Sequence, residues 1–140
     1  MGTDENRQTL LDAMGAFSRG DFATYFALYA DDAVLHGYTP EPLDRQGIAA
    51  FYTAFGESFS GATLTAHDTV AEGDRVTVRF TLAAAHTGEF QGVPATGNPI
   101  QADGITILRF RDGRCVERWS SFDFLTVLMQ IGAIPAPAAA

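Results

Sequence analysis

The feature that most constrains the fold is a hairpin signal at Asp112-Gly113. Asp-Gly favours a tight two-residue turn because both residues tolerate the positive φ angles that such a turn requires. Apolar runs rich in β-branched and aromatic residues flank the dipeptide on both sides. The sequence therefore predicts two long antiparallel strands, over residues 100–110 and 114–122.

Three helices are expected before these strands. Apolar residues recur at helical spacing after Asp4, which is the expected N-cap of the first helix, and again after Asp21, the expected N-cap of the second. The pair Asp31-Asp32 is expected to end the second helix. A short strand over residues 33–36, a proline-containing loop over residues 37–47 and a third helix follow.

The hydrophobic period changes from 3.6 to 2 near residue 62. Alternating apolar residues predict strands over residues 62–71 and 75–86, and the segment 87–99, rich in glycine and proline, predicts a loop at the rim of the sheet. Helices followed by a meander of strands indicate an α+β fold with the helices on one face of the sheet. A strongly twisted sheet around helices should leave a conical hollow.

Length and composition limit the remaining possibilities. The 140 residues suit one domain, expected over residues 1–134, with a flexible tail over 135–140. The net charge of −8 argues against nucleic acid or an anionic membrane as a partner. No targeting segment or 18-residue apolar run is apparent, so a cytoplasmic protein is expected. The three widely spaced histidines do not predict a metal site.

Asp123 is the main candidate for chemistry because it stands between two phenylalanines. A carboxylate in an apolar setting is costly unless neighbours satisfy it or the protein uses it. It could be the N-cap of a short helix expected over residues 124–131. Alternatively it lies in a pocket, where burial would raise its pKa toward the range useful for proton transfer. Trp119 has the same strand parity and is expected on the same wall.

His36 and His86 are the candidate partners of this aspartate. His86 falls on the apolar face of its strand, at the far end, and His36 ends the short strand near the expected mouth of the hollow. An imidazole in either place could polarise a carbonyl group or carry a proton. Each could equally be a satisfied polar residue at the end of a strand.

Aromatic side chains are the candidates for binding a substrate. The chain holds 11 phenylalanines, which suits an aromatic-lined hollow as well as plain core packing. Besides Trp119, the residues expected to contact a substrate are Phe80, Tyr25, Tyr29, Tyr52 and Phe55.

Two sequence patterns resemble known families. The order of the elements, with YADDA at residues 29–33, resembles the NTF2-like superfamily of cone-shaped domains. HTGEF at 86–90, DGR at 112–114 and the positions of Trp119 and Asp123 are similar to SnoaL-like polyketide (ester) cyclases. This resemblance implies an NTF2-like cone, with three N-terminal helices packed on a strongly curved, mostly antiparallel sheet of four to six strands that encloses a pocket.

The resemblance also implies an activity. SnoaL-like enzymes catalyse an intramolecular aldol cyclisation of a hydrophobic methyl-ester polyketide, without metal or organic cofactor, and Asp123 would be the general acid/base. The expected partners are a hydrophobic small molecule and a second copy of the chain, paired through the outer face of the sheet. Two alternatives stay open. One is another cofactor-free reaction in the same cavity, namely hydroxylation, dehydration or epoxide hydrolysis, and the other is binding of a hydrophobic ligand without catalysis.

Overall fold

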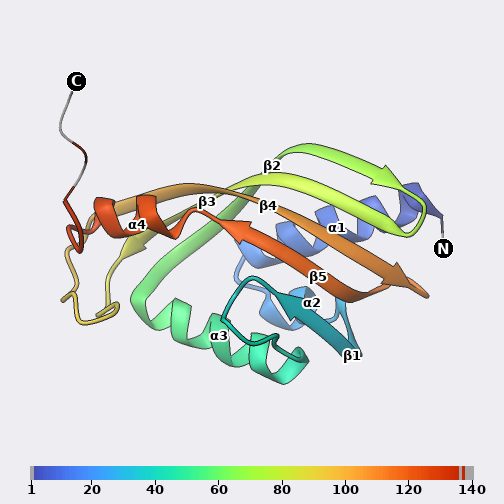
Figure 1. The fold of residues 1–140 in the computed structure, drawn as a ribbon, viewed down its shortest axis with the longest axis horizontal. Coiled ribbons are helices and arrows are strands. Elements are labelled where there is room, and N and C mark those ends of the chain that lie inside the picture. The colour runs from blue at the N-terminus through green and yellow to red at the C-terminus, as the bar shows by residue number, and fades with distance from the viewer. Residues whose placement is uncertain (1, 136, 138–140) are drawn as a thin grey trace.

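The computed structural model describes residues 2–135 and 137, which fold into helices and strands in the expected order (Figure 1). In chain order the elements are α1 (Thr3–Ser18), α2 (Phe22–Phe26), β1 (Tyr29–His36), α3 (Arg45–Ser58), β2 (Phe59–Glu72), β3 (Arg75–His86), β4 (Pro99–Arg111), β5 (Arg114–Phe122) and α4 (Phe124–Gln130).

The five strands form one sheet in the order β1-β5-β4-β3-β2. β1 runs parallel to β5, and the other neighbouring pairs are antiparallel. Figure 1 shows that the sheet is curved and that α1, α2 and α3 lie on its concave side, while α4 lies at the end of the sheet where β5 finishes. The predicted α+β fold, an NTF2-like cone with three N-terminal helices on a mostly antiparallel sheet, is confirmed.

The hairpin joins β4 and β5 as predicted. Asp112 and Gly113 both have positive φ angles, of 52° and 79°, and Arg111 pairs with Arg114 across the turn. Two positive φ angles at a two-residue turn match the right-handed twist of the flanking strands. This turn fixes where the pairing of β4 with β5 begins.

Two local expectations near the N-terminus are wrong. Gly2, not Asp4, is the N-cap of α1, so Asp4 lies in the first helical turn, where it pairs with Arg7. Asp31 and Asp32 do not end a helix but lie in β1 with exposed side chains. The strand starts earlier than expected because its first residue, the fully buried Tyr29, pairs with β5. The cap of α2 by Asp21 is confirmed.

The core lies between the three helices and the concave face of the sheet. On β3 the alternation predicted from the sequence is present, since Val76, Val78, Phe80 and Leu82 are all buried. Residues 136 and 138–140 of the expected tail lie outside the described residues. Within the described part of the chain, no helix is both long and apolar enough to cross a membrane.

Gly37 allows the chain leaving β1 to pass very close to β5. Its φ angle is +93°, and a Cβ atom built on it would lie 1.9 Å from the carbonyl oxygen of Ser120. A backbone oxygen cannot move aside as a flexible side chain can. Two requirements therefore select glycine here: a positive φ angle and the absence of a side chain.

We expect Gly37→Ala to lower the free energy of unfolding by more than about 2 kcal/mol, because it adds a backbone clash to the strain of a positive φ angle. Gly73→Ala is the matched control, since Gly73 has a φ angle of +60° but open space around it. That control should cost about 1–2 kcal/mol. Urea unfolding measures both variants, and equal costs would contradict the argument.

Candidate active site

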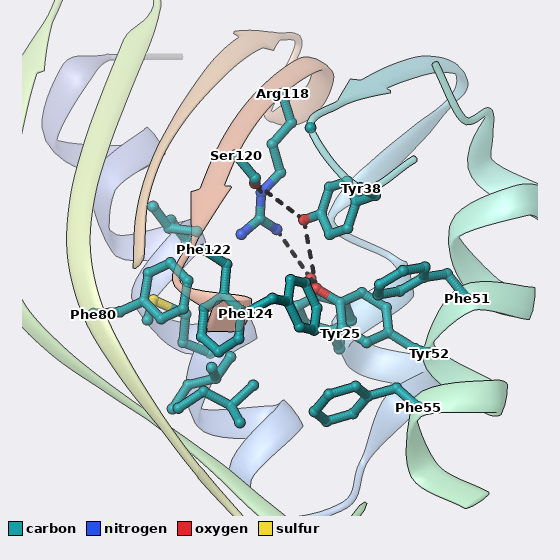
Figure 2. Close-up of a pocket in the computed structure, with 15 residues that line it drawn as sticks. Tyr25, Tyr38, Phe51, Tyr52, Phe55, Phe80, Arg118, Ser120, Phe122 and Phe124 are labelled. Carbon is teal, nitrogen blue, oxygen red and sulfur yellow. Dashed lines mark hydrogen bonds between the residues drawn. The ribbon is translucent and has the colours of Figure 1, made fainter. Parts of the chain in front are cut away.

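A pocket lies between the helices and the concave face of the sheet (Figure 2). Most of its wall is aliphatic or aromatic, and its polar groups are three tyrosines, one serine and one arginine. The lining residues are Leu10, Met14, Tyr25, Gly37, Tyr38, Phe51, Tyr52, Phe55, Leu64, Phe80, Leu82, Arg118, Ser120, Phe122 and Phe124.

The polar centre of the pocket is Arg118, which reaches inward from β5 and is only 6% exposed. Its Nε–H donates to Thr106 Oγ1 at 2.8 Å and to Ser120 Oγ at 3.1 Å. Its Nη1 donates to the hydroxyl oxygens of Tyr25, at 3.0 Å, and Tyr29, at 2.5 Å. We call these five residues the Arg118 cluster. Nη2 donates no hydrogen bond to any other described residue, so two of the five guanidinium N–H groups are left for a ligand.

Further tyrosines extend the Arg118 cluster along the wall. The hydroxyl of Tyr52 lies 3.4 Å from that of Tyr25 and 3.5 Å from that of Tyr38. Ser120 Oγ donates to the Tyr38 hydroxyl at 3.2 Å. A line of phenol groups therefore leads from the guanidinium to the middle of the pocket, as the dashed lines in Figure 2 show.

Burial determines the protonation of these groups. It raises the pKa of Tyr29 and Tyr52 well above the usual value and also raises the pKa of Tyr38, so all three remain neutral hydroxyls near pH 7. Burial alone would lower the pKa of Arg118, but the surrounding phenol oxygens outweigh it, and the pKa lies above its ordinary value. The site therefore holds one fixed positive charge.

No described residue that lines the pocket or hydrogen-bonds to Arg118 carries a carboxylate. Across the described residues, no group of three or more histidine, cysteine, aspartate or glutamate side chains is placed to hold a metal ion. The chemistry available inside the pocket is therefore hydrogen-bond donation from a cation and from neutral hydroxyls.

Asp123 is not buried, contrary to the expectation. Its exposed carboxylate caps α4, accepting from the Thr126 hydroxyl at 2.5 Å and from the Thr126 N–H at 3.0 Å. These two bonds hold the pKa of Asp123 below its usual value, so the expected rise is wrong. The N-cap interpretation is confirmed, and a role in catalysis stays a prediction.

Trp119 and His36 lie on the outer face of the sheet, so their expected places at the wall and mouth of the pocket are wrong. The two rings stack with centroids 5.7 Å apart, and the Arg75 guanidinium lies 5.2 Å from the Trp119 ring centre. His36 Nε2 lies 2.9 Å from Glu117 Oε2. Neighbours in a strand face opposite ways, so Arg118 points inward where Trp119 points outward.

His86 is fully buried on the concave side but does not line the pocket. Its Nδ1 lies 2.9 Å from Thr96 Oγ1 and accepts from the Thr96 N–H at 3.3 Å, and its ring packs against Phe59. The loop after β3 thus folds back onto the histidine, where Thr96 provides its hydrogen bonds.

Four of the other aromatic residues predicted to contact a substrate do line the pocket. Tyr25, Tyr52, Phe55 and Phe80 line the pocket, while Tyr29 lies behind the wall and holds Arg118. The contact of these residues with a substrate stays a prediction; the four that line the pocket lie where expected, and Tyr29 does not.

The sequence interpretation missed Arg118 because of a β-bulge. β4 pairs Phe110 with Cys115 and Arg109 with Glu117, which leaves Val116 as an extra residue. Without this bulge, strict alternation from the hairpin turn would place Trp119 inside. A bulge is hard to read from one sequence. Nor does Arg118 stand out in the strand, since β5 also contains Arg114, Glu117 and two serines.

We expect Asp123→Asn to leave the melting temperature nearly unchanged, because asparagine caps a helix as well as aspartate does, and Asp123→Ala to cost about 1 kcal/mol of stability. If Asp123 is also the general base, the Asn variant loses roughly 10²–10⁴-fold in turnover. Melting curves and turnover of both variants separate the two roles. Full activity of the Asn variant would exclude Asp123 as the base.

The chain is similar to proteins of one family. A sequence profile of the SnoaL-like polyketide cyclases matches residues 8–131. A comparison with curated proteins found no significant match.

Three solved structures illustrate the likeness. IdmH from Streptomyces antibioticus, a proposed polyketide cyclase, is 35% identical over 91% of this chain and 98% of its own, with a TM-score of 0.81. AclR from Streptomyces galilaeus, a proposed hydroxylase, is 26% identical over 98% and 87%, with a TM-score of 0.90. TsrD from Streptomyces laurentii shares the fold, at 23% identity over 96% and 99% and a TM-score of 0.83. The extent of the profile match shows that the chain belongs to the SnoaL-like polyketide cyclase family.

Proposed function

We propose that the protein is a cofactor-independent cyclase that folds and closes a hydrophobic, polyketide-like substrate, with the Arg118 cluster holding the reacting carbonyl oxygen. Membership of the cyclase family supports the reaction class. One observation carries the assignment of the site: among the described residues, a buried guanidinium in an aromatic pocket has unused N–H donors and no carboxylate partner.

The reaction would be an aldol-type ring closure. A carbon between two carbonyl groups loses a proton, and the electron pair moves onto a carbonyl oxygen as an enolate. The enolate carbon then forms a bond to another carbonyl carbon of the same chain, whose oxygen takes up a proton. Preorganised donors aimed at the developing oxygen charge stabilise it, and losing one such donor typically costs about 10²–10³-fold in rate. Arg118 Nη2 and the nearby phenols supply these donors.

The aromatic wall would orient the flexible chain. Phe80 and Phe122 stack with centroids 6.2 Å apart and nearly parallel rings, and Phe124 meets Phe122 edge-on. A second hollow, lined in part by Phe90, adjoins the pocket and shares part of its wall. A pocket that holds two parts of one chain in contact makes the chain lose conformational entropy on binding. Less entropy is then lost in the ring-closing step, so that step is faster.

Two groups are candidates for accepting the proton, the Asp123 carboxylate and water. Asp123 is the base that the family resemblance implies, and both of its sequence neighbours line the pocket while its own carboxylate is exposed. It would therefore act from the rim. The alternative is transfer to water from a carbon already acidified by two carbonyl groups. The Asp123→Asn variant decides between them.

Hydroxylation is the second candidate, since AclR is a proposed hydroxylase with a similar fold. Product mass distinguishes the reactions. Ring closure keeps the substrate mass or loses water, hydroxylation adds oxygen, and binding without catalysis returns the compound unchanged.

We also propose that the chain forms a homodimer through the outer face of the sheet, where Ile105 and Val70 are exposed large apolar side chains. Light scattering should then give about twice the chain mass of 15.0 kDa. A particle of one chain mass at micromolar concentration would refute the dimer.

We expect Arg118→Gln to reduce turnover by roughly 10²–10³-fold, because it removes the charge that faces the developing oxyanion. The assay uses a synthetic methyl-ester poly-β-ketone with EDTA present, and follows product by liquid chromatography and mass spectrometry. Arg109→Gln is the matched control, since Arg109 pairs with Glu117 and does not line the pocket. Unchanged turnover in a folded Arg118→Gln variant would refute the proposed site.

A further inference from the structure

We infer that the pocket is built to bind an ionised oxygen, so that the ligand meets Arg118 as a carboxylate or as the enolate of a 1,3-dicarbonyl group rather than as a neutral ester. The inference names the chemical form of the ligand at the proposed active site. It rests on the proposed function for the reaction, whereas the binding preference can be measured without any reaction.

The first reason is the charge balance of the site. Four other arginines pair with a carboxylate within 3.3 Å, namely Arg7, Arg79, Arg109 and Arg111, and all four have substantial solvent exposure. Arg118 is the reverse case, since it is buried and its described hydrogen-bond partners are all hydroxyl groups. A buried charge is costly unless an opposite charge compensates it, and an anionic ligand would supply that charge.

The titratable groups that face Arg118 do not supply it. They are the phenols of Tyr25, Tyr29, Tyr38 and Tyr52 and the thiol of Cys115. Burial raises the pKa of Cys115 to about 11, so the thiol is neutral at pH 7. The guanidinium is therefore stabilised by hydroxyl dipoles, and none of the described groups that face it carries a formal negative charge.

The second reason is the direction of the hydrogen bonds. The hydroxyl oxygens of Tyr25 and Tyr29 accept from Arg118 Nη1 and lie 2.8 Å from each other, so Tyr29 donates to Tyr25 where Tyr25 donates to Tyr52. Ser120 donates to Tyr38. A chain of hydroxyls that begins at a cation is polarised so that its last members present hydrogens. These hydroxyl hydrogens and the two hydrogens of Nη2 are the hydrogen-bond donors that the pocket offers to a ligand.

Such a site discriminates between charged and neutral oxygens. A neutral ester carbonyl can accept these hydrogen bonds but leaves the positive charge uncompensated. Hydrogen bonds to an ionised acceptor are roughly twice as strong as neutral ones. This difference in hydrogen-bond strength favours binding of the anion over the ester by about 10-fold or more in affinity.

Binding of 2-naphthoate and methyl 2-naphthoate, measured by isothermal titration calorimetry at pH 7, tests the inference. The two probes share a flat aromatic ring system and differ in the charge at one end. We expect naphthoate to bind at least about 10-fold more tightly to the wild-type protein. Equal binding, or tighter binding of the ester, would exclude a carboxylate ligand and, together with failure of the 1,3-dicarbonyl probe described next, would overturn the inference. Because this comparison uses the wild-type protein, it does not depend on a variant folding.

A 1,3-dicarbonyl probe, 2-acetyl-1-tetralone, distinguishes the two sources of negative charge. If the site takes enolates, the enolate absorbance of the bound probe appears below the pH at which the free probe ionises. Selective binding of naphthoate without this spectral change assigns a carboxylate ligand, and the spectral change assigns an enolate. Failure of both probes overturns the inference.

Arg118→Met tests the origin of the preference. It should abolish the advantage of naphthoate, while Arg109→Met, on the outer face, should retain it. Retention of the advantage in a folded Arg118→Met variant would overturn the assignment. Anion preference without turnover of a poly-β-ketone would refute only the cyclase proposal, and turnover without anion preference would refute only the present inference.

Discussion

The candidate site depends on one interaction, the contact of a buried guanidinium with hydroxyl groups instead of carboxylates. Four oxygens hold Arg118 in a fixed orientation and leave Nη2 free. A carboxylate partner would neutralise the cation and occupy its donors. Hydroxyls support the charge while leaving it able to act on a ligand, which is the condition for electrostatic stabilisation of an oxyanion.

The fold brings these hydroxyls together from distant parts of the sequence. α2 contributes Tyr25, β1 contributes Tyr29 and β4 contributes Thr106, while Arg118 and Ser120 come from β5, which lies between β1 and β4. The parallel pairing of β1 with β5 is essential here, because it places the N-terminal phenols beside the C-terminal strand. The helices lie on this concave side, and Tyr25, Tyr29 and Arg118 are buried beneath them.

The sequence predicted the architecture well because that depends on period and turn chemistry. The alternation of β3, the hairpin at Asp112 and the cap at Asp21 are local properties and were read correctly. The site is a different problem. Which face of β5 is inward depends on pairing with two neighbouring strands, so the interpretation placed Trp119 inside and overlooked Arg118. Asp123 misled for a similar reason, since flanking phenylalanines do not bury a residue that begins a helix.

The bulge at Val116 has a consequence for comparing relatives. The bulge determines which residues of β5 face inward. Without it, the residues after the bulge would exchange their inner and outer faces, and the Trp119 indole would face the cavity in place of the Arg118 guanidinium. Divergence in this family could then arise from backbone pairing with little change in residue identity. Residues that align between two members share a role only where both chains keep the bulge, so alignments of active sites should be anchored on strand pairing.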